Sequence, residues 1–307
     1  MKKILHVILI SLFSLTIISC AKKSNTSSSS SSESSAVKTL AGTGSSGSTD
    51  NSIGTLASFS RPRGITTDGT NLYVADFSNH LIRKIVISTG VVTTVAGKLW
   101  GGAGDPGSAN GTGTSASFNG PNGITTDGTN LYVSERNNHL IRKIVISTGV
   151  VTTLAGTGSS GWANGTGTSA SFYRPLGITT DGTNLYVSDT YNHWIRKIVI
   201  STGVVTTLAG FSAGSTDDTG TSASFKFPHG ITTDGTNLYV ADTWNYLIRK
   251  IVISTGAVTT VAGTGSSGSA NGTGTSASFY FPYGITTDGT NLYVADTKNY
   301  LIRKIEL

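Results

Sequence analysis

The chain has 307 residues, a net charge of +6 and only 12% charged side chains, with 39 glycines, three glutamates and no glutamine. Few residues are therefore suited to exposed helix faces, and many favour strands and turns. This excludes a coiled coil, a helical bundle and an acidic disordered chain, and the charge is too mild for a dedicated nucleic-acid-binding protein. Cys20 is the only cysteine, so no intrachain disulfide or cysteine-based zinc site can form.

The N-terminal segment, residues 1–19, is expected to be a signal peptide. Two lysines precede an apolar run over 4–18, which is shorter than the ~20 residues that span a bilayer. Residues 17–20, at the end of this segment, read Ile-Ile-Ser-Cys, which resembles a bacterial lipobox and implies cleavage before Cys20 and lipid attachment to it. The alternative is an ordinary cleaved signal with a chance cysteine.

Residues 20–36 are rich in serine and predict a flexible tether between the lipid and a folded body. We therefore expect an exported protein anchored in a membrane. The residue after the cysteine is Ala21 rather than aspartate. By resemblance to lipoprotein sorting rules, this favours the outer membrane or cell surface over the inner membrane.

The body, residues 37–307, consists of five copies of one unit. Asp-Gly-Thr-Asn-Leu-Tyr-Val recurs at 68–74, 127–133, 181–187, 234–240 and 288–294. Each copy predicts four strands: Gly-Ile-Thr-Thr, the strand after the Asp-Gly-Thr-Asn hairpin, Leu-Ile-Arg-Lys-Ile, and the strand after Ser-Thr-Gly. Four antiparallel strands at this period are typical of a propeller blade, so we expect an all-β, five-bladed β-propeller.

The two ends of the body predict how the ring closes. The last copy stops after its third strand, at Leu307, and the body begins with an unattached fourth strand at 36–42. We expect the N-terminal strand to complete the last blade, which would leave no unpaired blade edge.

The turn between the second and third strands reads Asn-His-Leu at 79–81 and 138–140, followed by Ile-Arg-Lys. With the closing Leu-Ala-Gly, this resembles bacterial NHL repeats over about 37–307. The resemblance implies a β-propeller, commonly of six blades, so five is a departure. It implies no single activity, because such propellers serve as RNA- or protein-binding domains, as sensor domains of bacterial kinases and, in one case, as a zinc-dependent lyase.

Comparison of the five copies indicates a candidate binding face. The copies agree in their hairpin turns and differ in the tetrapeptide before the glycine of Gly-Ile-Thr-Thr and in the turn between the second and third strands. Both variable places map to one face of the disc. They carry aromatic and basic residues, which suit ring-bearing or anionic ligands. The ligand-binding residues that we predict are Arg61, Arg63, Arg174, Phe227, His229, Trp244 and Tyr283.

Other chemistries are less well supported. His80, His139 and His193 occupy one repeated position that holds tyrosine in the last two copies, which indicates a structural role rather than a metal site. Every copy has an aspartate or glutamate at the end of its second strand and an arginine in Ile-Arg-Lys. Because the pair recurs in every copy, it indicates a structural hairpin contact. We predict no catalytic residue, metal or cofactor.

The leading hypothesis is a lipid-anchored binding module of the cell envelope for a carbohydrate, peptide or protein partner, with no nucleic acid expected. The alternative is a lyase or hydrolase acting at the channel mouth, around His229. A third possibility is a repeat body that only spaces or coats the surface.

Overall fold

A computed structural model describes residues 37–100 and 103–307. Five antiparallel sheets follow one another along the chain, as predicted, and no helix in the described ranges is long and apolar enough to cross a membrane. The predicted signal peptide and tether, including Cys20, lie outside the described residues. The compact unit begins at Thr39.

Blades 1, 2 and 3 each contain four main strands in the order first, second, third and fourth. Their strands are β1 (Pro62–Thr67), β2 (Asn71–Asp76), β3 (Leu81–Val86) and β4 (Val92–Ala96); β8 (Pro121–Thr126), β9 (Asn130–Glu135), β10 (Leu140–Val145) and β11 (Val150–Ala155); and β13 (Ile178–Thr180), β14 (Asn184–Asp189), β15 (Trp194–Val199) and β16 (Val204–Ala209). Short strands β7 (Gly111–Thr112) and β12 (Gly165–Thr166) extend blades 2 and 3, and β5 (Leu99–Trp100) pairs with β6 (Ala103–Gly104).

Blade 4 has four strands and blade 5 has three. They are β17 (Pro228–Thr233), β18 (Asn237–Asp242), β19 (Leu247–Val252) and β20 (Val258–Ala262), and then β21 (Pro282–Thr287), β22 (Asn291–Asp296) and β23 (Leu301–Glu306). Single 3₁₀ turns lie in the connectors and between second and third strands: η1 (Gly54–Leu56), η2 (Phe77–Asn79), η3 (Gly113–Ser115), η4 (Gly167–Ser169), η5 (Thr190–Asn192), η6 (Gly220–Ser222), η7 (Thr243–Asn245), η8 (Gly274–Ser276) and η9 (Thr297–Asn299).

The Asp-Gly-Thr-Asn hairpins show why the first two strands of each blade pair. In blade 1, the Asp68 carboxylate accepts the backbone N–H groups of Thr70 and Asn71 at 2.8 and 2.6 Å and the Tyr73 hydroxyl at 2.9 Å. Gly69 has a φ of 88°, which glycine adopts without strain. The same contacts recur in the other four hairpins, so these aspartates serve the turn, as predicted.

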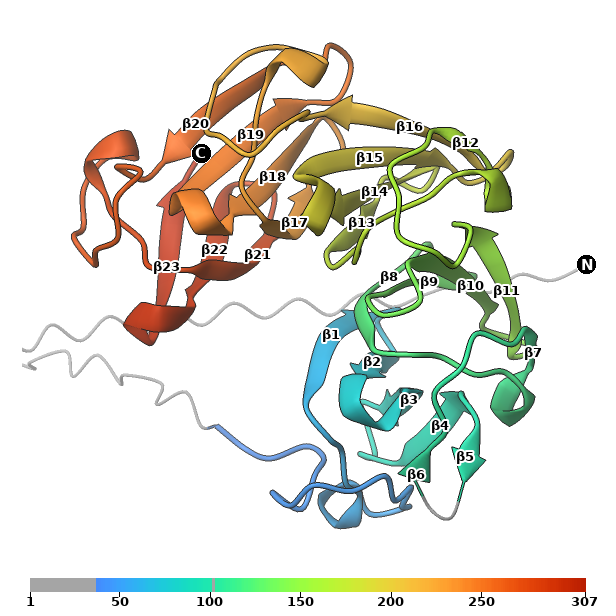
Figure 1. The fold of residues 1–307 in the computed structure, drawn as a ribbon. Coiled ribbons are helices and arrows are strands. Elements are labelled where there is room, and N and C mark those ends of the chain that lie inside the picture. Colours follow the sequence, from blue (N-terminus) through green and yellow to red (C-terminus); the bar gives the residue numbers. More distant parts are fainter. Residues whose placement is uncertain (1–36, 101–102) are drawn as a thin grey trace, which may run out of the picture. The chain divides into compact units, whose positions relative to one another are not determined.

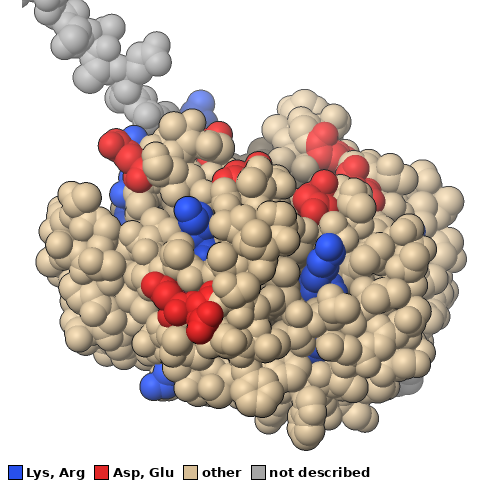
Figure 2. Space-filling model, turned by 90° about the horizontal axis from the view of Figure 1, so that it is seen from above, with Lys and Arg blue, Asp and Glu red and all other residues tan. Residues whose placement is uncertain are grey.

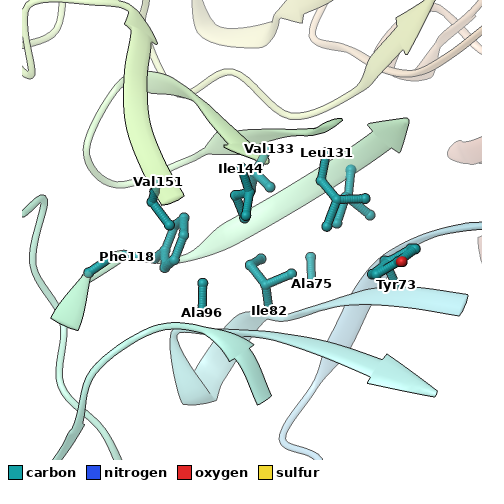
Figure 3. Close-up of a cluster of buried hydrophobic side chains, with 11 residues drawn as sticks. Tyr73, Ala75, Ile82, Ala96, Phe118, Leu131, Val133, Ile144 and Val151 are labelled. Atoms are coloured by element: carbon teal, nitrogen blue, oxygen red, sulfur yellow. The ribbon is translucent and has the colours of Figure 1, made fainter. Parts of the chain in front are cut away.

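The hydrophobic core lies between neighbouring blades. Ala75, Ile82 and Ala96 of blade 1 face Phe118 and Val133 of blade 2, and all are buried (Figure 3). Equivalent clusters join blades 2 and 3, 3 and 4, and 4 and 5. Strands that are apolar on both faces therefore pack between two neighbours, because burying apolar surface drives their association.

The first strands lie closest to the common centre of the sheets, and each lies beside the first strand of the next blade (Figure 1). A Cβ atom on the glycine of Gly-Ile-Thr-Thr would overlap with a backbone carbonyl of the next blade at Gly64, Gly123, Gly177 and Gly230. The fifth glycine, Gly284, meets only Ala295 in the same blade. Glycine is thus required wherever another blade follows.

The prediction that the N-terminal strand completes blade 5 is wrong. Blade 5 has only β21, β22 and β23, and residues 37–42 form no strand. Instead, the Gly42 N–H donates to Gly54 O of the blade 1 connector at 2.9 Å. Gly97, which follows the fourth strand of blade 1, donates its N–H in the same way to Gly113 O of the next connector at 3.2 Å. The N-terminal segment thus contacts the following blade as a fourth strand does, but it does not pair with a third strand.

The ring therefore has an open seam, which we define as the exposed surface of Ile65 on blade 1 and of Leu301 and Ile302 on blade 5. Ile65 is 59% exposed and Ile302 is 75% exposed, whereas Ile248, the equivalent of Ile302 in blade 4, is fully buried. Because the interfaces between blades are nearly identical, each blade is rotated from the previous one by nearly the same angle. Blades 1 and 5 of a five-bladed ring meet only if that angle is about 72°. Matching end sequences do not set this angle.

Candidate functional site

The two variable places lie next to each other, as the sequence predicted. The second residue of each turn between the second and third strands donates its N–H to the carbonyl of the first residue of the tetrapeptide, as Ser78 does to Ser60 O and Trp244 does to Lys226 O. In both cases the N···O distance is close to 3 Å, at 3.0 and 3.1 Å. Each blade thus contributes one variable patch to the same face.

These patches surround a cavity of about 800 Å³, which we call the axial bowl. Its size is within the range of about 300–1,000 Å³ that is usual for small-molecule sites. Side chains or backbone from all five blades line it: Arg61, Arg63, Gly64, Phe77, Asn122, Gly123, Arg136, Leu176, Gly177, Tyr191, Phe227, His229, Gly230, Trp244, Tyr283 and Gly284.

Six of the seven predicted ligand-binding residues line the axial bowl, which places them together without testing their role in binding. They are Arg61, Arg63, Phe227, His229, Trp244 and Tyr283. The seventh, Arg174, lies beside the bowl, with its guanidinium 4.8 Å from the centre of the Tyr191 ring. The comparison of the repeats therefore selected side chains that lie together in the structure.

Three lining residues of the same turns were not among the predicted site residues: Phe77, Arg136 and Tyr191. A signal for the first two existed in the repeats. Blades 3 and 4 have threonine there, and the hydroxyls of Thr190 and Thr243 donate to proline carbonyls of the next blade at 2.7 and 2.6 Å. Blades 1 and 2 replace this scaffold contact with a side chain that lines the bowl.

The second residue of each tetrapeptide has a left-handed backbone. Its φ is 50° in Arg61, 64° in Gly120, 52° in Arg174, 48° in Phe227 and 52° in Phe281. This conformation costs a residue other than glycine roughly 1–2 kcal/mol. Only blade 2 has glycine here, so four blades carry a large side chain at a position whose backbone conformation favours glycine. Strained residues of this kind cluster at functional sites.

The repeated histidines have the structural role that the sequence predicted. The Nδ1 atoms of His80, His139 and His193 accept the backbone N–H of Gly120, Arg174 and Phe227, each at 3.0 Å. These are the left-handed residues of the next blade. The histidine of one blade therefore fixes the tetrapeptide of its neighbour, and burial lowers the pKa of each ring, which keeps it neutral.

The repeated carboxylate and arginine also form the predicted hairpin contact. Arg196 and Asp189 are fully buried and lie 3.0 Å apart, and the other four blades contain the same pair. The Asp189 carboxylate also accepts the N–H of Tyr173, the first residue of the blade 3 tetrapeptide, at 2.7 Å. The ion pair thus anchors the start of each variable segment.

The electrostatics of the axial bowl are dominated by arginine. Burial, followed by the charges of Arg136 and Arg61, lowers the pKa of Arg63. Burial, followed by the charges of Arg63 and Arg136, lowers the pKa of His229 to about 4. His229 is therefore neutral at pH 7 and a weak base. Within residues 37–100 and 103–307, no three acidic or histidine side chains are grouped as a metal site would require.

Charged side chains elsewhere on the body are sparse. Figure 2 shows one face on which lysine, arginine, aspartate and glutamate are separated by wide uncharged areas. Against this background, the gathering of arginines at the axial bowl is a distinct local feature.

Comparison with known proteins supports an NHL-type propeller. Residues 230–252 match the family described as LVIVD repeat. The chain is 32% identical over 270 residues to the chloroplastic protein SUPPRESSOR OF QUENCHING 1 of Arabidopsis thaliana, which covers 82% of this chain and 25% of the relative. It is 31% identical over 286 residues to NHL repeat-containing protein 2 of Bos taurus, with 82% and 39% covered. The chain thus spans only about a quarter to two fifths of these relatives.

A solved structure shares the fold. The crystal structure of an auxiliary nutrient binding protein from Bacteroides thetaiotaomicron matches with a TM-score of 0.55 and 20% identity, over 80% of this chain and 69% of that one. At this level of identity, the likeness shows a shared fold.

Proposed function

We propose that this protein is a lipid-anchored binding module of the cell envelope that holds a carbohydrate, peptide or protein partner in the axial bowl. One observation carries the proposal: apart from the five glycines of Gly-Ile-Thr-Thr, every residue that lines the cavity occupies a position at which the five repeats differ. Unselected substitutions in solvated loops tend to leave small polar residues. This cavity is instead lined by arginine, tryptophan, tyrosine and phenylalanine, which are enriched at binding interfaces.

An enzyme acting at the bowl has less support. Among the described lining residues, His229 is the histidine, and no aspartate or glutamate accompanies it. A general base works best with a pKa near the operating pH, and this ring titrates near 4. Binding without chemistry needs neither a tuned base nor a metal.

The binding role is tested with the full-length chain in a mild nonionic detergent, screened against envelope glycans, peptidoglycan fragments and host matrix proteins. A triple variant, Phe227→Ala, Trp244→Ala and Tyr283→Ala, removes three aromatic surfaces of the bowl. We expect saturable binding that the variant loses while it stays folded by circular dichroism. Binding that survives in the variant would show that the bowl is the wrong site.

The lipid anchor rests on the sequence around Cys20. Two or three acyl chains give stable membrane attachment, because each buried methylene contributes about 0.8 kcal/mol. Labelling of cells with a radioactive or clickable fatty acid should mark the wild-type chain and not the variant Cys20→Ser. Fractionation of the same cells should place the wild type with the outer membrane or cell surface. An unlabelled wild-type chain would rule out the anchor.

A further inference from the structure

Three arginines that line the axial bowl, and Arg174 beside it, differ from the other arginines of the described residues in forming no ion pair with a carboxylate. Arg83, Arg142, Arg196, Arg249 and Arg303 each form an ion pair inside a blade. In the described part of the chain, Arg61, Arg63, Arg136 and Arg174 form none, and no acidic side chain lines the bowl. Arg63 is held in place by Asn122, whose Oδ1 accepts its N–H at 2.7 Å, and by the Phe77 ring at 3.7 Å.

Arg61, Arg63 and Arg136 line the same cavity, so one bound group can meet more than one of them. The charges of Arg136 and Arg61 both disfavour the charged form of Arg63. Burial raises the pKa of the Tyr191 hydroxyl, but the guanidinium groups of Arg174 and Arg136 beside it lower the pKa overall. Clustered like charges without a counterion repel each other, and a bound anion would relieve this repulsion.

The bowl is also divided into two unlike walls. Blades 1 to 3 supply the three lining arginines, Arg61, Arg63 and Arg136, together with the rings of Phe77 and Tyr191. Blades 4 and 5 supply Phe227, Trp244 and Tyr283 and no arginine. Arg174 and Phe281 lie beside the bowl, against Tyr191 and Trp244. The rings form a continuous apolar surface: Trp244 contacts Phe227 and Phe281 with ring centres 5.3 and 5.2 Å apart, and Phe281 stacks beside Tyr283. A ligand that fills the bowl would therefore meet arginines on one side and a group of aromatic rings on the other.

A neutral polar group lies at the aromatic wall. His229 meets the Tyr283 ring edge to face at 4.5 Å, and its ring nitrogens form no hydrogen bond with the described residues. A neutral imidazole offers one donor and one acceptor, which a hydroxyl group matches. Apolar ring faces pack against the C–H faces of a sugar, and a forked guanidinium binds a carboxylate through two hydrogen bonds.

We propose that the axial bowl binds an acidic sugar, a hexuronate at the end of an oligosaccharide, with its carboxylate on Arg63 and Arg136 and its ring against the aromatic wall. This inference rests on the proposed binding function and names its ligand class. A single-stranded nucleic acid fits less well, because it needs a groove that follows its backbone and ring faces free for stacking. Here the basic residues line one wall of a bowl, and most aromatic rings contact one another at steep angles.

The experiment is isothermal titration of the full-length chain in detergent with trigalacturonate, neutral galactotriose and an oligouridylate. The test variant is Arg63→Gln with Arg136→Gln. The charge-matched control is Lys143→Gln with Lys250→Gln, which lie on the third strands β10 and β19 outside the bowl. We expect trigalacturonate to bind the wild type and the lysine control equally, and the arginine variant at least about 50-fold more weakly. Rising salt should weaken the binding.

Each other outcome overturns the inference in a distinguishable way. Equal binding of galactotriose, or an arginine variant that binds as well as the wild type, would show that the anion does not direct recognition. Preferential binding of oligouridylate would assign the bowl to nucleic acid. If no acidic sugar binds but another ligand does, and the triple aromatic variant loses that ligand, only the ligand class fails. If the triple aromatic variant still binds trigalacturonate, the bowl itself is wrong.

Discussion

The Nδ1 atom of His193 in blade 3 accepts the backbone N–H of Phe227 in blade 4 at 3.0 Å, and the two rings meet edge to face with centres 4.5 Å apart. Phe227 has a φ of 48° at this point. A scaffold residue of one blade thus holds a bowl residue of the next in a conformation that its own backbone disfavours.

Replacing this acceptor should cost stability. His193→Phe leaves the Phe227 N–H without its partner, so we expect the free energy of unfolding to fall by about 1–2 kcal/mol. Chemical denaturation measures it. Tyr246→Phe is the matched control, because the tyrosine at this position in blade 4 already lacks an acceptor nitrogen. Equal losses in both variants would mean that the hydrogen bond contributes nothing.

The left-handed position separates stability from binding. Arg61→Gly should stabilise the protein by about 0.5–1 kcal/mol, because glycine adopts a φ of 50° without strain. The same variant should bind trigalacturonate more weakly. Arg61→Ala loses the same guanidinium but keeps the strain, so it should weaken binding without any gain in melting temperature. If Arg61→Ala also stabilised the protein, the destabilising effect of Arg61 would come from repulsion between charges rather than from its backbone conformation.

The buried ion pairs should be essential to the fold. Arg196→Met leaves the buried Asp189 carboxylate without its counterion, and such a loss costs about 3–5 kcal/mol. Denaturant titration of the full-length chain measures the change. The control is Lys197→Met, which changes the adjacent, half-buried side chain. Its free energy of unfolding should stay within about 0.5 kcal/mol of the wild-type value. Similar losses in both would argue against a special role for the pair.

The pKa of His229 predicts a dependence of stability on pH. The ring has a pKa of about 4 in the folded protein and about 6.5 in an unfolded chain. Between these values the unfolded chain binds a proton that the folded protein does not, so stability falls as the pH drops from about 6.5 to about 4. The measured quantity is the melting temperature of the wild type minus that of His229→Gln. This difference should decrease as the pH is lowered from about 6.5 to about 4 and should be constant above pH 7. A constant difference throughout would contradict the lowered pKa.

The open seam can be tested by one pair of equivalent residues. Ile248→Ala removes a fully buried side chain and should cost about 2–5 kcal/mol. Ile302→Ala removes a side chain that is 75% exposed and should stay within about 0.5 kcal/mol. Equal losses would show that a strand covers blade 5 in solution.

The sequence predicted the blades because their information is local. The Asp68 turn, its four copies and the alternating strands each specify a hairpin without reference to the rest of the chain. Closure of the ring was predicted wrongly, because it depends on a rotation set by packing between blades. Ile65 and Ile302 read like their buried counterparts, and only the packing shows that they are exposed.

The candidate site was predicted in part. Differences among the repeats identified the variable face, and six of the seven side chains chosen from it line the bowl, because the positions that the shared scaffold fixes are identical in all copies. The division into a basic and an aromatic wall was not predicted. It arises from the order in which blades surround the axis, which places Arg63 and Arg136 together and Phe227 beside Trp244.

Among the described residues, none lies close enough to Gly284 to require a glycine there. The four preceding glycines of this kind make room for the next blade, whereas the space beside Gly284 is open. Together with Ile302, it presents to solvent the same surface that Gly230 and Ile248 present to blade 5. A further copy of the unit would therefore find its interface already built. The size of such a propeller can change by whole duplications, and each new blade brings fresh loop positions for recognition without any redesign of the framework.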